Sequence, residues 1–468
     1  MSEQQKSSHK NGLKRGLQNR HVQLIAIAGT IGTGLFMGAG KTINLTGPSI
    51  LFIYLITGVF MYLMMRAIGE MLYYDPDQHT FINFITKYLG DSWGYFSGWS
   101  YWISLICIGM ADITAVGKYM QFWFPNWPAW AIQLGFLAIL SLVNLIAVRV
   151  FGEVEFWFAM IKIIAILALI ATAVMMAVTG FETPHGSVGL HNIVDGFQMF
   201  PNGFLSFLMA FQMVFFAYQA IEFIGITTSE TANPRQVLPK AIKEIPLRIV
   251  LFYGGSLIAI MSIIPWHELA GSGSELADSP FVKVFQLAGV KWAAALINFV
   301  VLASAASALN SALYSTGRHL YQIALDSPNK TMNRLGLNKL SRLHVPQNAI
   351  IFSVCVIALS ALLSALPGVK DSFSLVAASS SGVYIAIYIL TMIAHQRYRK
   401  SSDFMADGYL MPHYKILNPL TIAYFVFIFV TMFLQKDTLV GSIGSIVWIL
   451  VLGFYSHYKF SKENKNLK

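Results

Sequence analysis

The chain has 468 residues, of which 56% are hydrophobic and only 12% are charged, and its formal net charge is +10. Soluble globular domains are about 45–50% apolar and about 25% charged. This composition excludes a soluble enzyme, a nucleic-acid-binding domain, a disordered chain and a disulfide scaffold, and it leaves a protein that crosses a membrane many times.

The first 20 residues are polar and basic, and they contain no apolar stretch followed by a cleavage site. We interpret them as a tail rather than a signal peptide. The apolar runs that follow are long enough to cross a bilayer, which takes about 20 residues per helix. Twelve spans are predicted, at residues 21–42, 49–72, 92–122, 128–148, 154–178, 201–227, 246–266, 291–316, 349–366, 372–394, 418–434 and 441–458. We expect one transmembrane domain at 21–459 between tails at 1–20 and 460–468.

Most lysines and arginines lie in the two tails and in the loops after the even-numbered spans. Basic residues accumulate in the cytoplasmic loops of membrane proteins. Since the number of spans is even, this bias predicts that both termini are cytoplasmic, and it explains the positive charge by topology. We therefore expect a multi-pass protein of the cytoplasmic membrane, with the lipid bilayer rather than nucleic acid as its partner.

Two predicted spans contain residues that interrupt a helix. The first reads LIAIAGTIGTGLFMGAG, in which glycine is denser than helix packing requires. The sixth reads FFAYQAIEFIGITTSE and places Gln219 and Glu222 at mid-depth. Unwound backbone is tolerated at this depth only where it lines a cavity or binds something. Broken helices at equivalent positions of two halves indicate a secondary transporter built from inverted repeats.

Among the ionisable residues inside the predicted spans, we single out Asp112, Lys162 and Glu222 as candidates. A charge at the bilayer centre costs at least about 2.5 kcal/mol on insertion scales, so such residues face protein or water and are functional by default. Burial favours the neutral form of a lysine, and Lys162 can therefore gain and lose a proton. The alternative is a structural salt bridge to Glu222 or Asp112. Asp112 is either a structural partner of Lys118 or of a neighbouring helix, or part of a proton route.

Other chemistries lack their motifs. The histidines lie mostly in tails and loops, and neither HExxH nor a paired Cys/His spacing occurs. The GxxxxGK[ST] phosphate loop is also missing from the sequence. We therefore expect no enzymatic activity, no catalytic residues, no metal and no cofactor. A membrane enzyme, an ATP-driven pump and a channel are less favoured than a carrier, and the sequence does not indicate an oligomeric state.

Five motifs identify a family when they are taken together: LKRGLQNRHVQLIAIAGTIGTGLF, MRAIGEM, FGEVEFWFAMIKIIAI, ETANPRQVLPKAI and ASAASALNSALYSTGRHL. With them the chain resembles the bacterial amino acid permeases of the amino acid–polyamine–organocation superfamily. GMADITAV and AGKTINLTGPSI add a resemblance to permeases for D-serine, D-alanine and glycine and to serine/alanine permeases. The resemblance implies an all-α polytopic membrane protein with about 12 transmembrane helices, a five-helix inverted repeat and broken helices 1 and 6.

The function implied by this resemblance is import of amino acids by proton symport with alternating access. Small neutral amino acids (alanine, serine and glycine, including D-forms) are the expected substrates, and the proton is the expected coupling ion. A permease for another class (threonine, histidine, aromatic or lysine) and an amino acid exchanger stay open as alternatives.

The resemblance also implies where the substrate binds. It places the substrate carboxylate on the backbone and hydroxyl around Gly32, Thr33 and Gly34. It places the ammonium on carbonyls near Thr30 and on span 6. The span 6 residues implied in binding are Phe216, Ala217, Tyr218 and Gln219, with Phe216 and Tyr218 as aromatic gates. Related permeases usually have glycine where this chain has Ala220, and the added methyl predicts a smaller pocket.

For coupling, the resemblance implies that Lys162 bridges span 1 near Gly29 to span 8 near Ser304 and Ser307. The protonated lysine would tie the two groups of helices together, and the neutral lysine would release them. Glu222 is implied to hydrogen-bond the broken segments and to carry a proton.

Charged residues near the inner ends of the spans are interpreted as ion pairs at gates or loops. Glu230 lies beside the inner end of span 6, and Arg66 with Glu70 lies at the inner end of span 2. Exposed pairs of this kind contribute little to stability.

Overall fold

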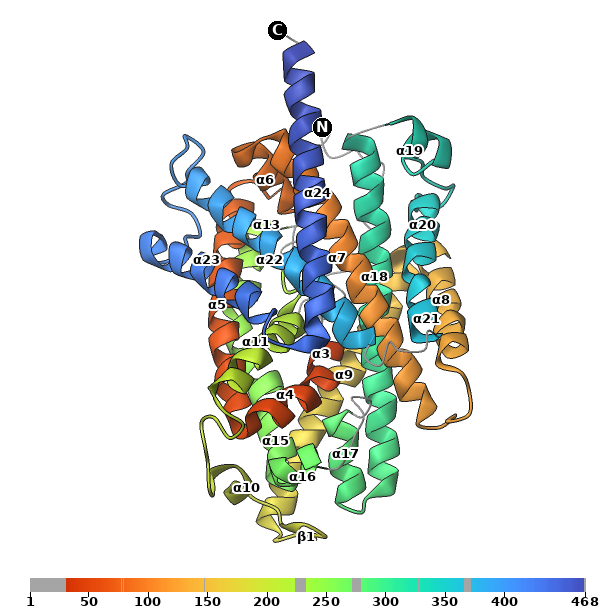
Figure 1. The fold of residues 1–468 in the computed structure, drawn as a ribbon, viewed down its shortest axis with the longest axis vertical. Helices are drawn as coiled ribbons and strands as arrows, with labels where there is room; N and C mark the ends of the chain where they lie inside the picture. The colour runs from red at the N-terminus through yellow and green to blue at the C-terminus, as the bar shows by residue number, and fades with distance from the viewer. Residues whose placement is uncertain are drawn as a thin grey trace.

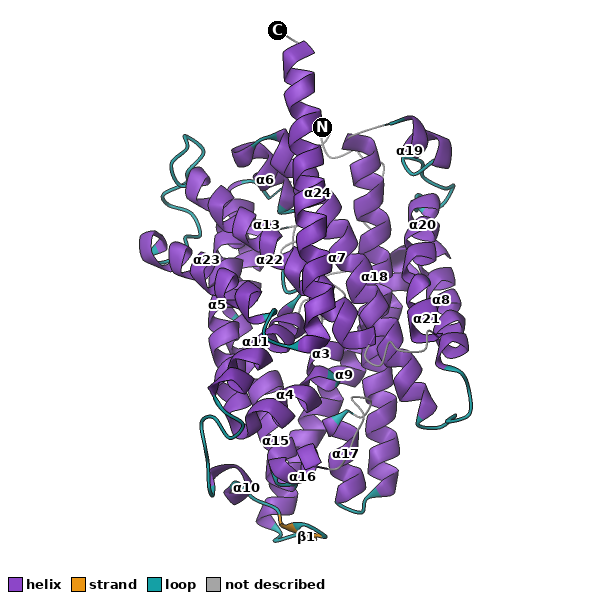
Figure 2. Cartoon of the chain, viewed as in Figure 1, coloured by secondary structure: helices purple, strands orange, loops and turns teal. Residues whose placement is uncertain are grey.

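A computed structural model describes residues 31–76, 78, 80–146, 148–223, 233–271, 279–326, 329–365 and 372–466. Within these ranges the chain folds into a bundle of helices (Figures 1 and 2). Two short strands, β1 (Glu182–Thr183) and β2 (Gly186–Ser187), form an antiparallel hairpin at one end of the bundle.

The helices of the first half of the chain are α3 (Thr33–Phe36), α4 (Gly38–Thr46), the 3-10 turn η1 (Gly47–Ser49), α5 (Ile50–Tyr74), α6 (Ile82–Leu89), α7 (Asp91–Gln121), α8 (Ala129–Ile146), α9 (Val148–Val178), α10 (His191–Val194) and α11 (Phe204–Tyr218). Those of the second half are α13 (Pro234–Lys243), α14 (Ile245–Arg248), the π-helix η2 (Ile249–Gly254), α15 (Gly255–Ile263), α16 (Trp266–Gly271), α17 (Pro280–Leu287), α18 (Lys291–Asp326), α19 (Lys330–Leu335), α20 (Gln347–Ile357), α21 (Leu359–Ala365), α22 (Ser372–Tyr398), α23 (Tyr414–Thr431) and α24 (Lys436–Asn466).

Ten helices of the described part are long and apolar enough to cross a membrane. They correspond to predicted spans 2–5 and 7–12, because each of those spans is a continuous apolar run. The two remaining spans, the first and the sixth, are represented by the short helices α3, α4 and α11. These are the two spans in which the sequence predicted a break.

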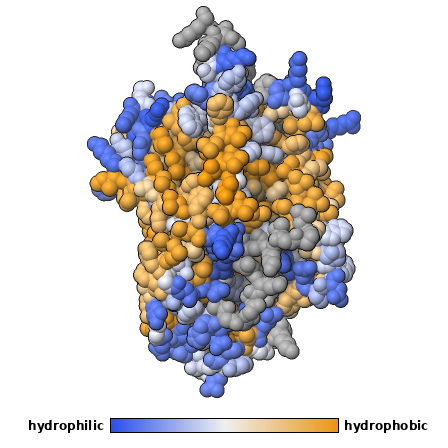
Figure 3. Space-filling view, in the orientation of Figure 1, coloured by the Kyte–Doolittle hydropathy of each residue, from blue (hydrophilic) through white to orange (hydrophobic). Residues whose placement is uncertain are grey.

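An apolar belt surrounds the bundle. Large hydrophobic side chains such as Val178, Ile416 and Phe454 are strongly exposed on its outside. Figure 3 shows this hydrophobic surface between two more hydrophilic ends of the molecule. Side chains of this kind are stable on the outside of a protein only when lipid covers them, so the surface confirms a multi-pass membrane protein.

The centre of the bundle is α7, which packs most extensively against α18 and α22. The other faces of α18 contact α9 and α20, and α22 also packs against α24. Polar residues on α7, α9, α18 and α22 therefore converge on the interior rather than on lipid.

The chain is unwound at both predicted breaks. Gly32 is extended, with φ −139° and ψ −163°, directly before α3 begins. In the sixth span α11 ends at Tyr218, Gln219 has φ −59° and ψ 154°, and Ala220 has a positive φ of 68°. A residue with a positive φ lies outside the conformation of a right-handed helix, so α11 cannot continue through Ala220.

The two breaks lie side by side, because α11 packs along α3 and α4. The approach is closest at Gly34, where an added Cβ would be 2.4 Å from the Cα of Ala217. Only glycine fits such a contact between two backbones.

The C-terminal segment 460–468, which was predicted as a tail, is helical as far as Asn466, because α24 continues into it. Polar residues such as Lys, Glu and Asn sustain a helix in water, so the end of the apolar run does not end the helix. The tail at 1–20 lies outside the described residues, as do Gly29, Thr30 and Glu230.

Candidate substrate and coupling site

A cavity lies where the two unwound segments face α7, α9 and α18. It has an empty volume of about 640 Å³, part of which is open to solvent. Its lining residues are Gly32, Thr33, Gly34, Leu105, Ile108, Asp112, Glu155, Lys162, Phe216, Ala217, Gln219, Ala220, Phe223, Ala308, Ser311 and Ala312. Of the predicted substrate-binding residues in the described part, all except Tyr218 line this cavity.

The start of α3 supplies backbone donors to the cavity. The carbonyl of Gly32 accepts hydrogen bonds from the amides of Leu35 and Phe36. The amides of Thr33 and Gly34 belong to the first turn, where no earlier carbonyl of the helix is in position to accept from them. Free amides and the helix dipole both attract a carboxylate.

Thr33 and Asp112 are joined across the cavity wall. The Thr33 hydroxyl donates to Oδ1 of Asp112 over 2.7 Å, and both side chains are buried. The other oxygen, Oδ2 of Asp112, is buried without a hydrogen-bond partner in the described part of the chain. The sequence left open whether Asp112 is a structural partner or part of a proton route. Its bond to Thr33 of α3 is the kind expected of a structural partner of a neighbouring helix.

Lys162 is buried on α9 and holds the first break. Its Nζ donates to the carbonyl of Ile31 over 3.1 Å. The hydroxyl of Ser304 on α18 donates to the same carbonyl over 3.2 Å. The unwound residue Ile31 is therefore tied to α9 and α18 at once. The bridge between spans 1 and 8 was expected near Gly29, which lies outside the described residues, and the contacts described here are made at Ile31.

Ser307 was expected beside Ser304 at the bridge that Lys162 makes between spans 1 and 8. Its hydroxyl donates to Oε1 of Glu155 on α9 over 2.6 Å. The second carboxylate oxygen of Glu155 accepts from Asn310 over 3.3 Å, and Asn310 in turn accepts from Asn144 of α8 over 2.8 Å. A carboxylate is a stronger acceptor than a backbone carbonyl, and Glu155 lies opposite Ser307, so the serine bonds to Glu155.

Glu155 itself was missed in the sequence. It is the second residue of the predicted span 154–178 and was not chosen as a candidate, yet it is buried and lines the cavity. A signal was present, because Glu155 precedes Lys162 by seven residues. Residues seven apart lie on the same face of a helix, two turns from each other.

Glu222 lies in a cage of tyrosine hydroxyls. Tyr101 and Tyr384 donate to Oε1 over 3.0 and 3.1 Å, and Tyr388 donates to Oε2 over 2.7 Å. The carboxyl group is fully buried. Tyr101 belongs to α7 and the other two belong to α22, so Glu222 ties the second break to two long helices.

Gln219 is held at the second break by two serines of α22. Its amide nitrogen donates to Ser381 over 2.9 Å, and its amide oxygen accepts from Ser380 over 2.8 Å. Phe216 lines the cavity and makes an edge-to-face contact with Phe373 of α22, with 5.7 Å between ring centroids. Its position agrees with the predicted aromatic gate.

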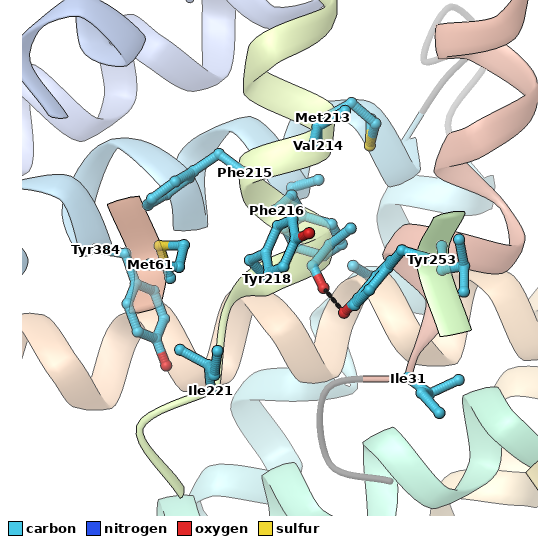
Figure 4. Close-up of a cluster of buried hydrophobic side chains, with 14 of the residues drawn as sticks. Ile31, Met61, Met213, Val214, Phe215, Phe216, Tyr218, Ile221, Tyr253 and Tyr384 are labelled. Carbon is cyan, nitrogen blue, oxygen red and sulfur yellow. Dashed lines mark hydrogen bonds between the residues drawn. The ribbon is translucent and has the colours of Figure 1, made fainter. Parts of the chain in front are cut away.

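Tyr218 does not line the cavity, in contrast to the prediction. Its hydroxyl donates to the carbonyl of Tyr54 on α5, and its ring stacks on Tyr253 at 4.7 Å. Figure 4 shows Tyr218 and Tyr253 together beside α11, and the dashed line is the hydrogen bond from Tyr253 to the Ala217 carbonyl. Tyr218 is in the last turn of α11, and its rotation about that helix turns the ring toward α5.

Arg66 and Glu70 do not pair with each other. Arg66 donates to the carbonyl of Leu410 and stacks over the ring of Tyr409. Glu70 is buried and binds His395 of α22 and Arg399, which directly follows this helix. The pair was predicted from the place of both residues at the inner end of span 2, and the end of α22 and the segment after it supply their partners instead.

The comparisons with known proteins agree with this geometry. The amino acid permease family matches residues 21–468, and the chain belongs to this family. Among its relatives, the DL-alanine permease SerP2 of Lactococcus lactis is 49% identical, with 95% of each chain covered. The serine permease SerP1 of the same organism is 47% identical, covering 95% of this chain and 97% of the relative. The D-serine/D-alanine/glycine transporter of Escherichia coli K12 is 40% identical over 94% of this chain and 93% of the relative.

Proposed function

We propose that this permease imports small neutral amino acids by proton symport with alternating access. The observation that carries the proposal is the cavity at two adjacent helix breaks, with a buried lysine bound to one of them. Alanine, serine and glycine are the proposed substrates, which accords with the printed names of the relatives as alanine, serine and D-serine/D-alanine/glycine carriers.

The ends of a zwitterion have separate partners in the cavity. The free amides at Thr33 and Gly34 suit the substrate carboxylate. Carbonyls in the last turn of α11, at Phe216 and Ala217, suit the ammonium, since each accepts one hydrogen bond in the structure and a carbonyl oxygen can accept two. Binding at both breaks would draw α3 and α11 together, so an occupied cavity differs in free energy from an empty one.

Lys162 is the proposed coupling residue. A protonated lysine makes a charge-assisted hydrogen bond to Ile31, which is stronger than the bond of a neutral amine. Loss of the proton weakens the tie between α9 and the first break, while Ser304 continues to hold the same carbonyl. Glu222 is proposed as a second proton-carrying group, because its buried carboxyl group meets three tyrosine hydroxyls. A hydroxyl can both donate and accept, so these tyrosines can bond the ionised carboxylate and the neutral carboxyl group alike.

Small side chains near the cavity support small substrates. Ala220, Ala308 and Ala312 line it, and each contributes no more than a methyl group. The methyl of Ala220 takes the place usual for glycine in related permeases. A bulky substrate side chain would contact these walls, whereas that of alanine or serine would fit.

The orientation follows from charge. The lysines and arginines of the even-numbered loops gather at the end of the bundle that carries α6, α19 and the C-terminal part of α24. We assign this end to the cytoplasm, which places both termini inside a bacterial cell.

The test uses proteoliposomes of the full chain under an imposed pH gradient, with labelled alanine. The wild type is expected to concentrate alanine, and a protonophore is expected to abolish this. The Lys162→Met variant is expected to bind alanine without concentrating it. Lys118→Met is the matched control, since Lys118 is on α7 outside the cavity, and it should concentrate alanine like the wild type. Accumulation by Lys162→Met against the alanine gradient would overturn the coupling assignment.

A further inference from the structure

The wall of the cavity formed by α18 carries one hydroxyl among methyl groups. Ala308, Ser311 and Ala312 line the cavity there. Ala308 faces the first break, since a Cβ on Gly32 would be 3.8 Å from the Cβ of Ala308. Ser311 follows Ala308 by three residues, which is about 4.5 Å along the helix axis. The hydroxyl is thus displaced from the substrate-carboxylate region by about the reach of a short side chain.

The other polar side chains that line the cavity are bonded. Lys162 donates to Ile31. Both oxygens of Glu155 accept hydrogen bonds, as does the amide oxygen of Gln219, whose nitrogen also donates. Thr33 donates to Asp112. Among the described residues, two polar side-chain atoms of the wall lack a hydrogen bond, namely Oδ2 of Asp112 and Oγ of Ser311.

A serine hydroxyl on a helix often bonds to the backbone of the turn before it. Several serines on the spanning helices donate to the carbonyl four residues earlier, as Ser353 does to Ala349 and Ser381 does to Ala377. Such back-bonding is the usual way in which serine is accommodated within a helix. Ser311 makes no such bond in the structure, and its side chain is partly exposed on the cavity wall. It can therefore both donate and accept.

We propose that Ser311 is a specificity-determining residue that binds the side-chain hydroxyl of serine. This inference rests on the proposed function. Asp112 is the less suitable partner, because its carboxyl group is bonded to Thr33 at the end of the cavity assigned to the main-chain groups of the substrate. Alanine lacks a hydroxyl and leaves Ser311 without this bond, so the residue separates two substrates of almost the same size.

The size of the effect follows from the chemistry. A hydrogen bond between neutral groups is worth enough to change affinity by about 3- to 10-fold. Removal of the Ser311 hydroxyl should weaken serine binding by this factor and leave alanine binding unchanged. A pocket that discriminates by shape alone would instead change both substrates together.

The experiment measures labelled serine and alanine uptake by the full chain in the same proteoliposomes. The readout is the ratio of the two KM values, which does not depend on how much protein is inserted. Ser311→Ala is expected to raise the serine KM about 3- to 10-fold relative to alanine. Ser315→Ala is the matched control, because Ser315 lies one turn further on α18 and outside the cavity lining, and its ratio should equal that of the wild type.

The outcomes separate this inference from the proposed function. An unchanged ratio in Ser311→Ala, or an equal change in Ser315→Ala, would overturn the role of Ser311 while alanine and serine uptake still stood. If Ser311→Ala inserts poorly, Ser311→Cys tests the same point, since a thiol is a weaker hydrogen-bonding group of similar shape, and its ratio should also rise. Failure of the wild type to transport either amino acid would contradict the proposed function itself.

Discussion

Ala220 is the residue at which the second break is made. It is one of three described residues other than glycine with a positive φ, and it lines the cavity. This conformation costs a residue with a Cβ about 1–2 kcal/mol. The same Cβ narrows the pocket, so one methyl group affects both the backbone and the size of the cavity.

We expect Ala220→Gly to widen the range of substrates with little loss of stability. Relief of the positive φ and the greater freedom of glycine in the unfolded chain are each about 1 kcal/mol and opposite in sign. The removed methyl leaves room for a larger side chain, so threonine uptake should rise relative to alanine. Competition of labelled alanine uptake by threonine measures this.

The control for Ala220 is His413→Gly. His413 also has a positive φ but precedes α23, away from the cavity. It should show the backbone effect on melting temperature without any change in selectivity. A shift toward threonine in both variants would contradict the role of the Ala220 methyl group.

Among the elements, α3 and α11 depend on the closest backbone contact at the site. A methyl at Gly34 would lie 2.4 Å from the Cα of Ala217, and backbone atoms cannot move as a flexible side chain does. We expect Gly34→Ala to separate the two breaks, to abolish uptake and to destabilise the protein by about 1–3 kcal/mol through overpacking. Thermal unfolding in detergent and uptake of labelled alanine measure the two effects.

Gly135 of α8 provides the comparison for Gly34. Nothing lies within 4 Å of a Cβ added there. Gly135→Ala should keep full uptake and gain up to about 1 kcal/mol of helix stability. Equal loss of activity in the two variants would show that the contact between α3 and α11 is not the cause.

The short helix α6 is linked to the segment after α22 by a charged pair. Lys87 lies 2.8 Å from Asp403, and Tyr88 also donates to Asp403. The hydrogen bond from Lys87 lowers the pKa of Asp403 below its usual value. Burial disfavours the charged form of Lys87, but its hydrogen bonds to Asp403 and Tyr74 outweigh this and raise its pKa.

The sign of the pH dependence follows from these two shifts. The contribution of Asp403 is present above its unfolded pKa of about 3.9 and is lost as the pH falls through its lower folded value. The contribution of Lys87 is present below its unfolded pKa of about 10.4 and is lost only as the pH rises through its higher folded value. The pair should therefore be intact throughout the neutral range.

We expect the difference in melting temperature between the wild type and Asp403→Asn to be small, because the pair is partly exposed. The difference should be constant from about pH 6 to 8 and should shrink toward acid. Thermal unfolding across this range measures it. A difference that grows as the pH falls would contradict the assigned sign.

At the scale of the whole molecule, a buried ionic cluster joins α5 to the end of α22 and the segment that follows it. Glu70 is bound by Arg399 at 2.5 Å, by His395 at 3.1 Å and by the backbone amide of Met411 at 2.6 Å. Asn418 of α23 contacts the second nitrogen of His395 at 2.9 Å. One carboxylate thus organises three parts of the chain at the end of the bundle assigned to the cytoplasm.

We expect Glu70→Gln to lower the free energy of unfolding by about 3–5 kcal/mol, because it leaves the Arg399 guanidinium buried without a counter-charge. Asp437→Asn is the matched control, since Asp437 pairs with Lys41 at a half-exposed position, and it should cost less than about 1 kcal/mol. Unfolding in detergent by heat or denaturant compares them.

The double variant Glu70→Gln with Arg399→Met tests the same pair from the other side. The double variant should be less destabilised than the sum of its two single variants, because it leaves neither charge buried without its partner. Strict additivity would show that Glu70 and Arg399 act independently.

The sequence by itself determined the class of protein, ten of the spans and the location of both breaks. These properties are local. A run of about 20 apolar residues partitions into lipid wherever it occurs, and clustered glycine or polar residues interrupt the helix that contains them. It also selected Lys162, Asp112 and Glu222 as candidates, since charged groups inside a span are costly unless they are used. Thr33 was implied by the resemblance to amino acid permeases.

Only the tertiary structure decided which groups meet. The partners of Thr33 and Glu70 lie 79 and 329 residues away along the chain, at Asp112 and Arg399. The prediction for Tyr218 was wrong because the rotation of a side chain about its helix is set by packing against α5. That the Ser311 hydroxyl is unbonded can be recognised only when the positions of all neighbouring polar groups are known, because hydrogen-bond partners are set by distance in space and not along the chain.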